Sequence, residues 1–157
     1  MCWLCDNPHR STEDYLDVLR EIIRTHRWAV QYVEGEDRPF AYTIGLHALG
    51  LPELVITGLP PQQSARVMNS IAHDVVDHGT VLAPAMHIEY QSELMLEVVE
   101  VEHPDVHLGF AVALFGPEIR ALQVVWTDDH RHWPWDRGWL HGRRRQPVLG
   151  RRTPLAG

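Results

Sequence analysis

The sequence predicts one α+β domain, in which about three helices flank a mainly antiparallel or barrel-like sheet. Its 157 residues suit a single domain with a hydrophobic core, because a chain of about 150 residues buries roughly 70% of its unfolded surface. A hydrophobic content of 45% and a charged content of 22% are typical of globular proteins and exclude wholesale disorder. Strand-like segments come in neighbouring groups rather than in strict alternation with helices, which favours antiparallel pairing.

The first half of the chain predicts a helix, three strands and a second helix. Ser11 and Asp14 have the S-x-x-D spacing of a capping box, and apolar residues then recur at helical spacing as far as about His26. Proline at 60–61 opens the second helix, because proline is favoured in the first turn, and Gly79 ends it. Apolar runs between turn residues predict strands at 28–33, 40–46 and 53–59.

The second half continues with strands and one short helix. The apolar runs predict strands at 86–91, 94–102 and 119–126 and a short buried helix at 106–116. We place the domain at residues 12–142, after an N-terminal segment of residues 1–11. Residues 143–157 combine arginine with proline and glycine, and we expect them to form a flexible tail.

The charges are uneven, and all 14 basic residues are arginine. The absence of lysine excludes Schiff-base catalysis and the lysine-dependent P-loop, because guanidinium cannot supply that chemistry. Residues 1–142 hold 21 acids against nine arginines, a net charge of −12, whereas the tail holds five arginines and no acid. The acidic body argues against nucleic acid as a partner. The basic tail could contact a protein partner or another anionic surface, or it could fold back on the acidic body.

No segment is long and apolar enough to span a membrane, and the N-terminus lacks the pattern of a signal peptide. We therefore expect a cytoplasmic protein. Its two cysteines, Cys2 and Cys5, are then expected to be reduced thiols rather than a disulfide.

The first candidate site is the cluster Cys2-x-x-Cys5-x-x-x-His9 at the N-terminus. Two thiolates at this spacing can hold one tetrahedral metal ion, at about 2.3 Å for Zn²⁺, with His9 as a third ligand. Zinc or iron is the expected metal, and the fourth ligand must come from elsewhere in the chain. Redox-active thiols and inert thiols are the alternatives.

The second candidate site is the segment DDHRHWPWD, residues 128–136. In extended backbone His130 and His132 project from the same face, so they could hold one metal ion, with carboxylates as further ligands. The alternative is a polar loop in which the tryptophans pack back on the core.

The third candidate site lies along the second predicted strand, at Tyr42, Thr43, Gly45 and His47. A glycine inside a strand indicates a bulge or the close approach of another backbone or a ligand. The order of elements resembles that of flavin-binding split barrels, so these residues are candidates for cofactor binding. Further candidates for cofactor binding are Asp128 and Trp135. A structural glycine in an ordinary strand is the alternative.

The sequence resembles the bacterial domain of unknown function (DUF) 4262 family over roughly residues 12–140. The resemblance is carried by FAYTIGL at 40–46, by Pro-Glu-Leu at 52–54 and by Asp128 followed by Pro-Trp at 134–135. The leading CxxC is similar to that of actinobacterial members. The family brings no established reaction, so the resemblance implies domain boundaries rather than chemistry.

These observations lead to one main functional hypothesis and two alternatives. The main hypothesis is a small metal-binding or ligand-binding accessory protein with a Cys/His site at its N-terminus. A flavin-type oxidoreductase, with a pocket completed by a homodimer, is the first alternative. An interaction or immunity factor without catalysis is the second. Whether the protein is an enzyme stays open at this point.

Overall fold

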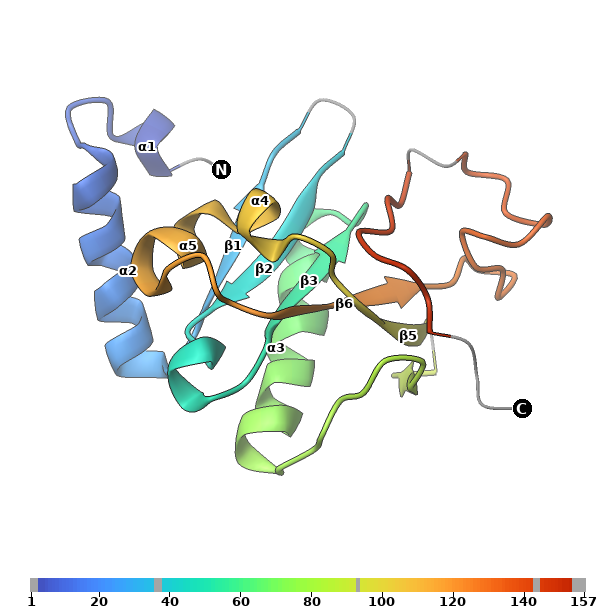
Figure 1. Cartoon of the computed structure of the whole chain (residues 1–157). Coiled ribbons are helices and arrows are strands. Elements are labelled where there is room, and N and C mark those ends of the chain that lie inside the picture. Colours follow the sequence, from blue (N-terminus) through green and yellow to red (C-terminus); the bar gives the residue numbers. More distant parts are fainter. Residues whose placement is uncertain (1–2, 36–37, 93, 143–144, 154–157) are drawn as a thin grey trace.

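The structure is a computed structural model that describes residues 3–35, 38–92, 94–142 and 145–153 (Figure 1). It contains one open, mixed sheet in the order β1-β2-β3-β6-β5-β4. All neighbouring strands are antiparallel except β3 and β6. The strands are β1 (Ala29–Val33), β2 (Phe40–Ile44), β3 (Glu53–Thr57), β4 (His87–Tyr90), β5 (Leu94–Glu100) and β6 (Ala121–Trp126).

The structure confirms the α+β class and the mainly antiparallel sheet, but the barrel-like alternative is wrong. The sheet is not closed, because β1 and β4 stand at opposite ends of the strand order. Each has one neighbour on its inner side within the described ranges. An edge strand leaves a row of backbone N–H and C=O groups without partners in the sheet, and β1 is such a strand.

Helices cover both faces of the sheet. They are α1 (Trp3–Asp6), α2 (Thr12–His26), the 3₁₀ helix η1 (Leu46–Leu49), α3 (Pro61–Asp77), α4 (Pro104–His107) and α5 (Gly109–Phe115). The expected capping box is present, since Asp14 N donates to Ser11 Oγ and Ser11 N donates to the Asp14 carboxylate. The proline at the first turn of α3 is also as expected. Neither α1 nor η1 was predicted.

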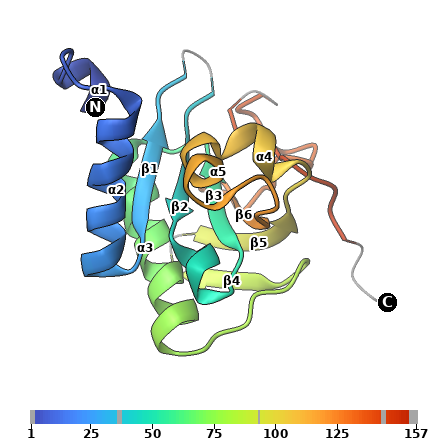
Figure 2. The ribbon, with the colours of Figure 1, turned by 60° about the vertical axis from the view of Figure 1, so that its left-hand side comes forward.

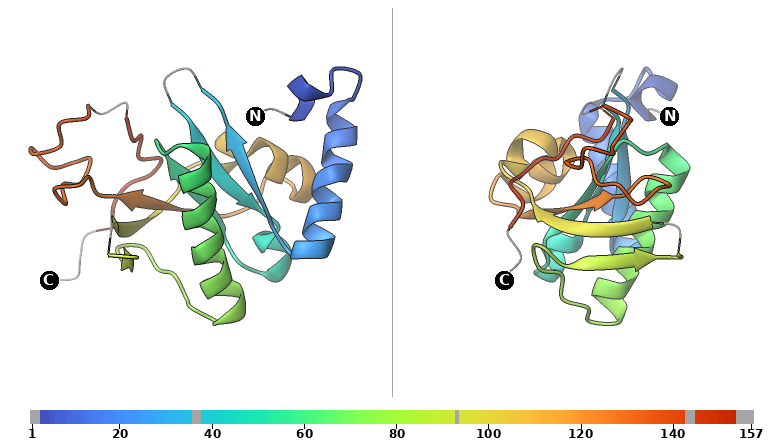
Figure 3. Two further views of the ribbon diagram at one scale, coloured as in Figure 1. Left: turned by 180° about the vertical axis from the view of Figure 1, so that it is seen from behind. Right: turned by 90° about the vertical axis from the view of Figure 1, so that its right-hand side faces the viewer.

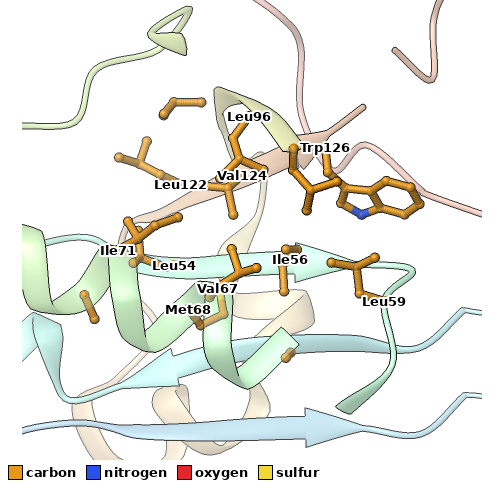
Figure 4. Packing of buried hydrophobic residues seen from close by; sticks show 14 of the residues in the cluster. Leu54, Ile56, Leu59, Val67, Met68, Ile71, Leu96, Leu122, Val124 and Trp126 are labelled. Carbon is orange, nitrogen blue, oxygen red and sulfur yellow. The ribbon is translucent and has the colours of Figure 1, made fainter. Parts of the chain in front are cut away.

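The core has two parts, one on each face of the sheet. On one face, Val67, Met68 and Ile71 of α3 pack against Leu54 of β3 and Val124 of β6 (Figure 4). On the other face, α2 and α5 cover the side chains that alternate with these along the same strands. This two-faced burial explains why β3 and β6 are buried along their whole lengths.

The segment after β6 differs from the flexible tail that we expected. Gln146 is buried, and its side chain bonds both the N–H and the C=O of Trp126 at 2.8 Å. The Pro147 carbonyl accepts hydrogen bonds of 2.8 Å from the Thr57 hydroxyl and from the Gln123 amide. Residues 145–153 therefore form a strap across β3 and β6, and we call them the C-terminal strap. A glycine is needed at 58, because a Cβ there would lie 2.1 Å from the Arg145 carbonyl.

Candidate functional site

The N-terminal cysteine site is only partly described, because Cys2 lies outside the described residues. Cys5 is on α1 and His9 follows it, and both side chains are exposed. Within the described ranges, no group of three His, Cys, Asp or Glu side chains is placed to hold a metal ion. The metal hypothesis therefore stays a prediction.

The segment after β6 is a loop organised by Asp128. Its buried Oδ1 accepts hydrogen bonds from His130 N at 2.9 Å and from His132 N at 2.8 Å. Burial alone would raise the pKa of Asp128, but these N–H groups outweigh it and hold the pKa below its ordinary value. Nδ1 of His132 is 3.3 Å from Oδ2 of Asp128, and Nε2 of His141 is 4.0 Å from the same oxygen. The main contribution of Asp128 is to shape the turn.

Trp135 belongs to a charged and aromatic cluster that the sequence did not indicate. The Glu97 carboxylate, 2% exposed, accepts 2.7 and 3.0 Å bonds from Arg152 and lies 2.8 Å from His87 Nε2. Burial favours a higher pKa for Glu97, yet the bonds from Arg152 and His87 lower it overall. The Arg152 guanidinium lies 3.7 Å from the centre of the Trp135 ring, which stacks on Trp133.

A cavity of about 410 Å³ adjoins this cluster. It lies between the loop that contains Pro134 and Trp135 and the C-terminal strap, and Trp135 and Arg152 both line it. The Trp135 ring already contacts Arg152 and Trp133, and the Arg152 guanidinium is already bonded to Glu97. The polar groups at this cavity are thus largely used in holding the strap to the sheet.

The candidate residues along the second predicted strand surround the buried carboxylate of Glu53. Glu53 accepts hydrogen bonds from the Thr43 hydroxyl at 2.7 Å, Gly45 N at 2.8 Å and His47 N at 3.1 Å. Burial raises the pKa of Glu53 despite these bonds. The Glu53 carboxylate therefore holds the backbone at the start of η1, and the Thr43 hydroxyl donates to the same carboxylate. The His47 side chain is exposed.

Two of these residues approach other backbone segments. Gly45 has a φ of +129°, and a Cβ there would lie 2.4 Å from the Arg27 carbonyl. The close approach expected at Gly45 is thus made by the chain itself. The Tyr42 hydroxyl accepts a 3.0 Å bond from Phe110 N, and burial raises the pKa of Tyr42 to about 12. The structure does not bring these residues together with Asp128 or Trp135 in one cavity among those that it describes.

A concave feature runs along the edge of β1 that has no neighbouring strand among the described residues. It consists of three cavities of about 470, 580 and 300 Å³ that share Tyr15 of α2. Val30 lines the first and second, and Trp3 of α1 lines the second and third. Figures 2 and 3 show α2 and α3 on either side of this edge. We call this feature the β1 groove.

The walls of the β1 groove are mainly aromatic and aliphatic, with amides between them. Trp3 packs on Tyr15 with ring centres 5.2 Å apart. The Tyr15 hydroxyl donates to the Gln31 side chain, whose Nε2 donates to the Tyr32 carbonyl at 3.1 Å. Aromatic surface with a few fixed polar groups is the usual composition of a ligand site.

Sequence reasoning missed the β1 groove because its parts come from distant segments. The alternating pattern at 28–33 indicates a strand but not its position in the sheet. Trp3 and Ala65 lie far from this strand in the sequence, one on either side, and line the groove without belonging to a motif. The one available signal was the local excess of aromatic and amide residues.

Comparisons with known proteins give a family but no function. A family model described as "Domain of unknown function (DUF4262)" matches residues 22–140, so the chain belongs to this family. The match covers most of the range over which the sequence resembled it. No curated protein and no solved structure matches the chain significantly. No helix within the described ranges is long and apolar enough to cross a membrane.

Proposed function

We propose that this member of the DUF4262 family is a binding protein whose ligand occupies the β1 groove. One observation carries the proposal: the three cavities adjoin one another along a strand edge that the described residues leave open. Two of them, of about 470 and 580 Å³, are as large as typical sites for small ligands. This proposal keeps the ligand-binding role expected from the sequence and moves its site to β1.

The chemistry of the walls defines the ligand class. Trp3, Tyr15 and Tyr32 offer ring faces and edges, which favour an apolar or aromatic group. Gln62 of α3 adds an amide to the same cavity. No charged side chain lines this middle cavity among the residues that the structure describes. The ligand we propose is therefore uncharged where it contacts the middle cavity, with an apolar group and with polar atoms that an amide can bind.

The N-terminal segment contributes to the same proposal. Trp3 and Cys5 both line the cavity of about 300 Å³, so α1 forms one wall of the β1 groove. A zinc or iron ion held by Cys2, Cys5 and His9 would fix α1 and with it Trp3. This metal is part of the proposal, and metal analysis of cysteine variants tests it separately.

The test is a screen of uncharged aromatic amides by ligand-observed NMR, with N-acetyl-tryptophanamide as the reference compound. Ala65 lines the middle cavity, so Ala65→Phe should fill it and reduce binding by at least about tenfold, equivalent to about 1.4 kcal/mol. Arg66→Phe places the same side chain at the next position, which is exposed and lines none of the three cavities. Equal binding by the wild type and both variants would contradict the proposal.

A further inference from the structure

The geometry points to an extended peptide segment of another protein as the ligand of the β1 groove. We infer that this segment adds to the sheet as a strand beside β1. The inference rests on the proposed function, since it names the ligand class for the same site. In this mode of recognition, backbone hydrogen bonds provide affinity, and pockets for alternate side chains provide specificity.

The register of the sheet shows which backbone groups β1 offers. The Pro39 carbonyl accepts a 2.9 Å bond from Gly58 N, on the side of β2 that faces β3. Backbone groups alternate between the two sides of an antiparallel strand, so the even-numbered residues of β2 bond to β1. Gln31 is in register with Tyr42, which is one of these even-numbered residues, so the backbone groups of Gln31 face β2. Val30 and Tyr32, on either side of Gln31, therefore direct their N–H and C=O groups outward.

The groove places these outward groups where a strand would lie. Val30 lines the cavities of about 470 and 580 Å³, and Tyr32 lines those of about 580 and 300 Å³. The side chains of an added strand would alternate between the α2 side, with Leu19 and Ile22, and the α3 side, with Ala65. The Tyr32 carbonyl already accepts a 3.1 Å bond from the side-chain amide of Gln31, and its second lone pair can accept a donor of an added strand.

The composition of the middle cavity defines the segment further. This cavity has no charged side chain among its described residues, and aromatic and aliphatic side chains form most of its walls. The centre of the segment is therefore uncharged and apolar. Antiparallel addition is the more stable pairing, and it places the N-terminal side of the segment beside the C-terminal end of β1.

The shape of the groove favours such a segment over a second copy of this chain. Both α2 and α3 contact β1 and flank its edge on opposite faces of the sheet (Figures 2 and 3). Two copies that met edge to edge would bring their four flanking helices against one another. A single extended segment carries no such helices and fits between the walls.

The experiment selects peptides from a phage-displayed random library against the full chain and measures a labelled synthetic peptide by fluorescence anisotropy. Val30→Pro removes one outward N–H, and proline is tolerated at such positions of edge strands. We expect Val30→Pro to weaken peptide binding about tenfold, as expected for the loss of one hydrogen bond. The circular dichroism spectrum and the urea unfolding midpoint of Val30→Pro should match those of the wild type, which shows that the variant folds. Val81→Pro, at a site 81% exposed and outside the groove, is the matched control.

A second arm uses peptides that are N-methylated at one position each. Addition to β1 predicts that methylation weakens binding at every second position only, because alternate N–H groups face the strand. Failure to select a peptide, or binding that neither Val30→Pro nor N-methylation weakens, would overturn the inference. A dimer that Val30→Pro dissociates would overturn it too, because the occupant would be a second copy. The screen of uncharged aromatic amides tests ligand binding in the β1 groove separately, so the proposed function can stand even where the peptide inference fails.

Discussion

Three buried carboxylates, Glu53, Glu97 and Asp128, each lie among donors that fit an acceptor. Glu53 is bonded by the N–H groups at the start of η1, Asp128 by those of its own loop, and Glu97 by Arg152 and His87. A buried carboxylate without such partners would be strongly unfavourable. At the residue scale, Thr43, Gly45 and Asp128, which the sequence named as candidates for cofactor binding, take part in hydrogen bonds that support local backbone structure.

Only some of this residue-scale structure could be predicted. The capping residues of α2 and the glycine at 45 have local signatures. The capping box is present, and another backbone segment lies close to Gly45. The pairing of Glu97 with Arg152 joins residues 55 positions apart, and no local pattern encodes it. The sequence named Asp128 as a candidate for cofactor binding, but its sequence neighbourhood does not show that its carboxylate bonds to the backbone of its own loop.

The free energy of unfolding should decrease at acidic pH because of Glu97 and Asp128. Glu97 and Asp128 have lowered pKa values in the folded state, so their contribution to stability is present above the unfolded pKa and is lost as pH falls through the folded pKa. Glu53, whose pKa is raised, acts in the opposite direction: its favourable contribution is lost as pH rises. We expect the free energy of unfolding to fall more steeply in the wild type than in Asp128→Asn between about pH 6 and about pH 3.

Urea unfolding at a series of pH values measures this difference. In the Asp128→Asn variant, the side-chain amide oxygen can still accept both loop hydrogen bonds, so folding should be retained. Asp129→Asn changes an exposed neighbour and serves as the control, with a pH profile like that of the wild type. Parallel profiles for the wild type and Asp128→Asn would show that Asp128 has no coupling to folding.

The cysteine hypothesis is also tested at single residues. Purified wild-type protein should contain stoichiometric zinc or iron, and the Cys2→Ser/Cys5→Ser variant should lose it, because thiolates provide most of the ligand strength. His9→Ala should reduce the metal content if His9 is the third ligand, and His78→Ala, at an exposed position after α3, is the control. Metal analysis by mass spectrometry gives the result. Folded, metal-free wild-type protein would rule the site out.

At the scale of elements, the helix and strand boundaries follow from periodicity and turn residues. The six strands and the three longer helices lie where the apolar patterns placed them, because each pattern reflects burial of one face or of both. The order of the strands could not be predicted from these patterns. The last strand in the sequence, β6, pairs in parallel with β3 from the first half of the chain. In the resulting strand order β1 stands at the edge of the sheet.

Gly45 connects two elements and offers an element-scale prediction. Its φ of +129° and the 2.4 Å distance from a built Cβ to the Arg27 carbonyl leave no space where the end of α2 meets the end of β2. Gly45→Ala should therefore lower the free energy of unfolding by about 1–3 kcal/mol, measured by urea denaturation. Gly109→Ala, with no atom within 4 Å, should be close to neutral. Equal effects of the two substitutions would show that the junction can relax.

At the scale of the whole molecule, the C-terminal strap makes residues 145–153 part of the fold. Composition predicted a flexible tail there, because arginine, proline and glycine are typical of disordered arms. The strap is held instead by buried partners on β3, β5 and β6 that the composition cannot show. Of its arginines, Arg152 bonds to Glu97, and Arg151 lies 3.6 Å from Glu102. This placement limits what the tail can offer to a separate partner.

Removal of one strap contact should weaken the whole fold. Arg152→Ala leaves the 2% exposed Glu97 with His87 as its one remaining side-chain partner among the described residues, so we expect a loss of about 1–3 kcal/mol in the free energy of unfolding. Arg151→Ala removes a pair whose side chains are 93% and 54% exposed, and it should cost less than about 1 kcal/mol. Urea denaturation of both variants compares them. Equal losses would mean that the strap does not depend on Glu97.

The central claim, that the ligand binds along β1, is tested most directly by mapping amide chemical shifts in ¹⁵N-labelled protein during titration with N-acetyl-tryptophanamide. We predict saturable shifts at Val30, Tyr32 and Ala65, which line the β1 groove. The competing cavity of about 410 Å³, at Trp135 and Arg152, should show none. Shifts confined to Trp135 and Arg152, with β1 unchanged, would contradict the claim.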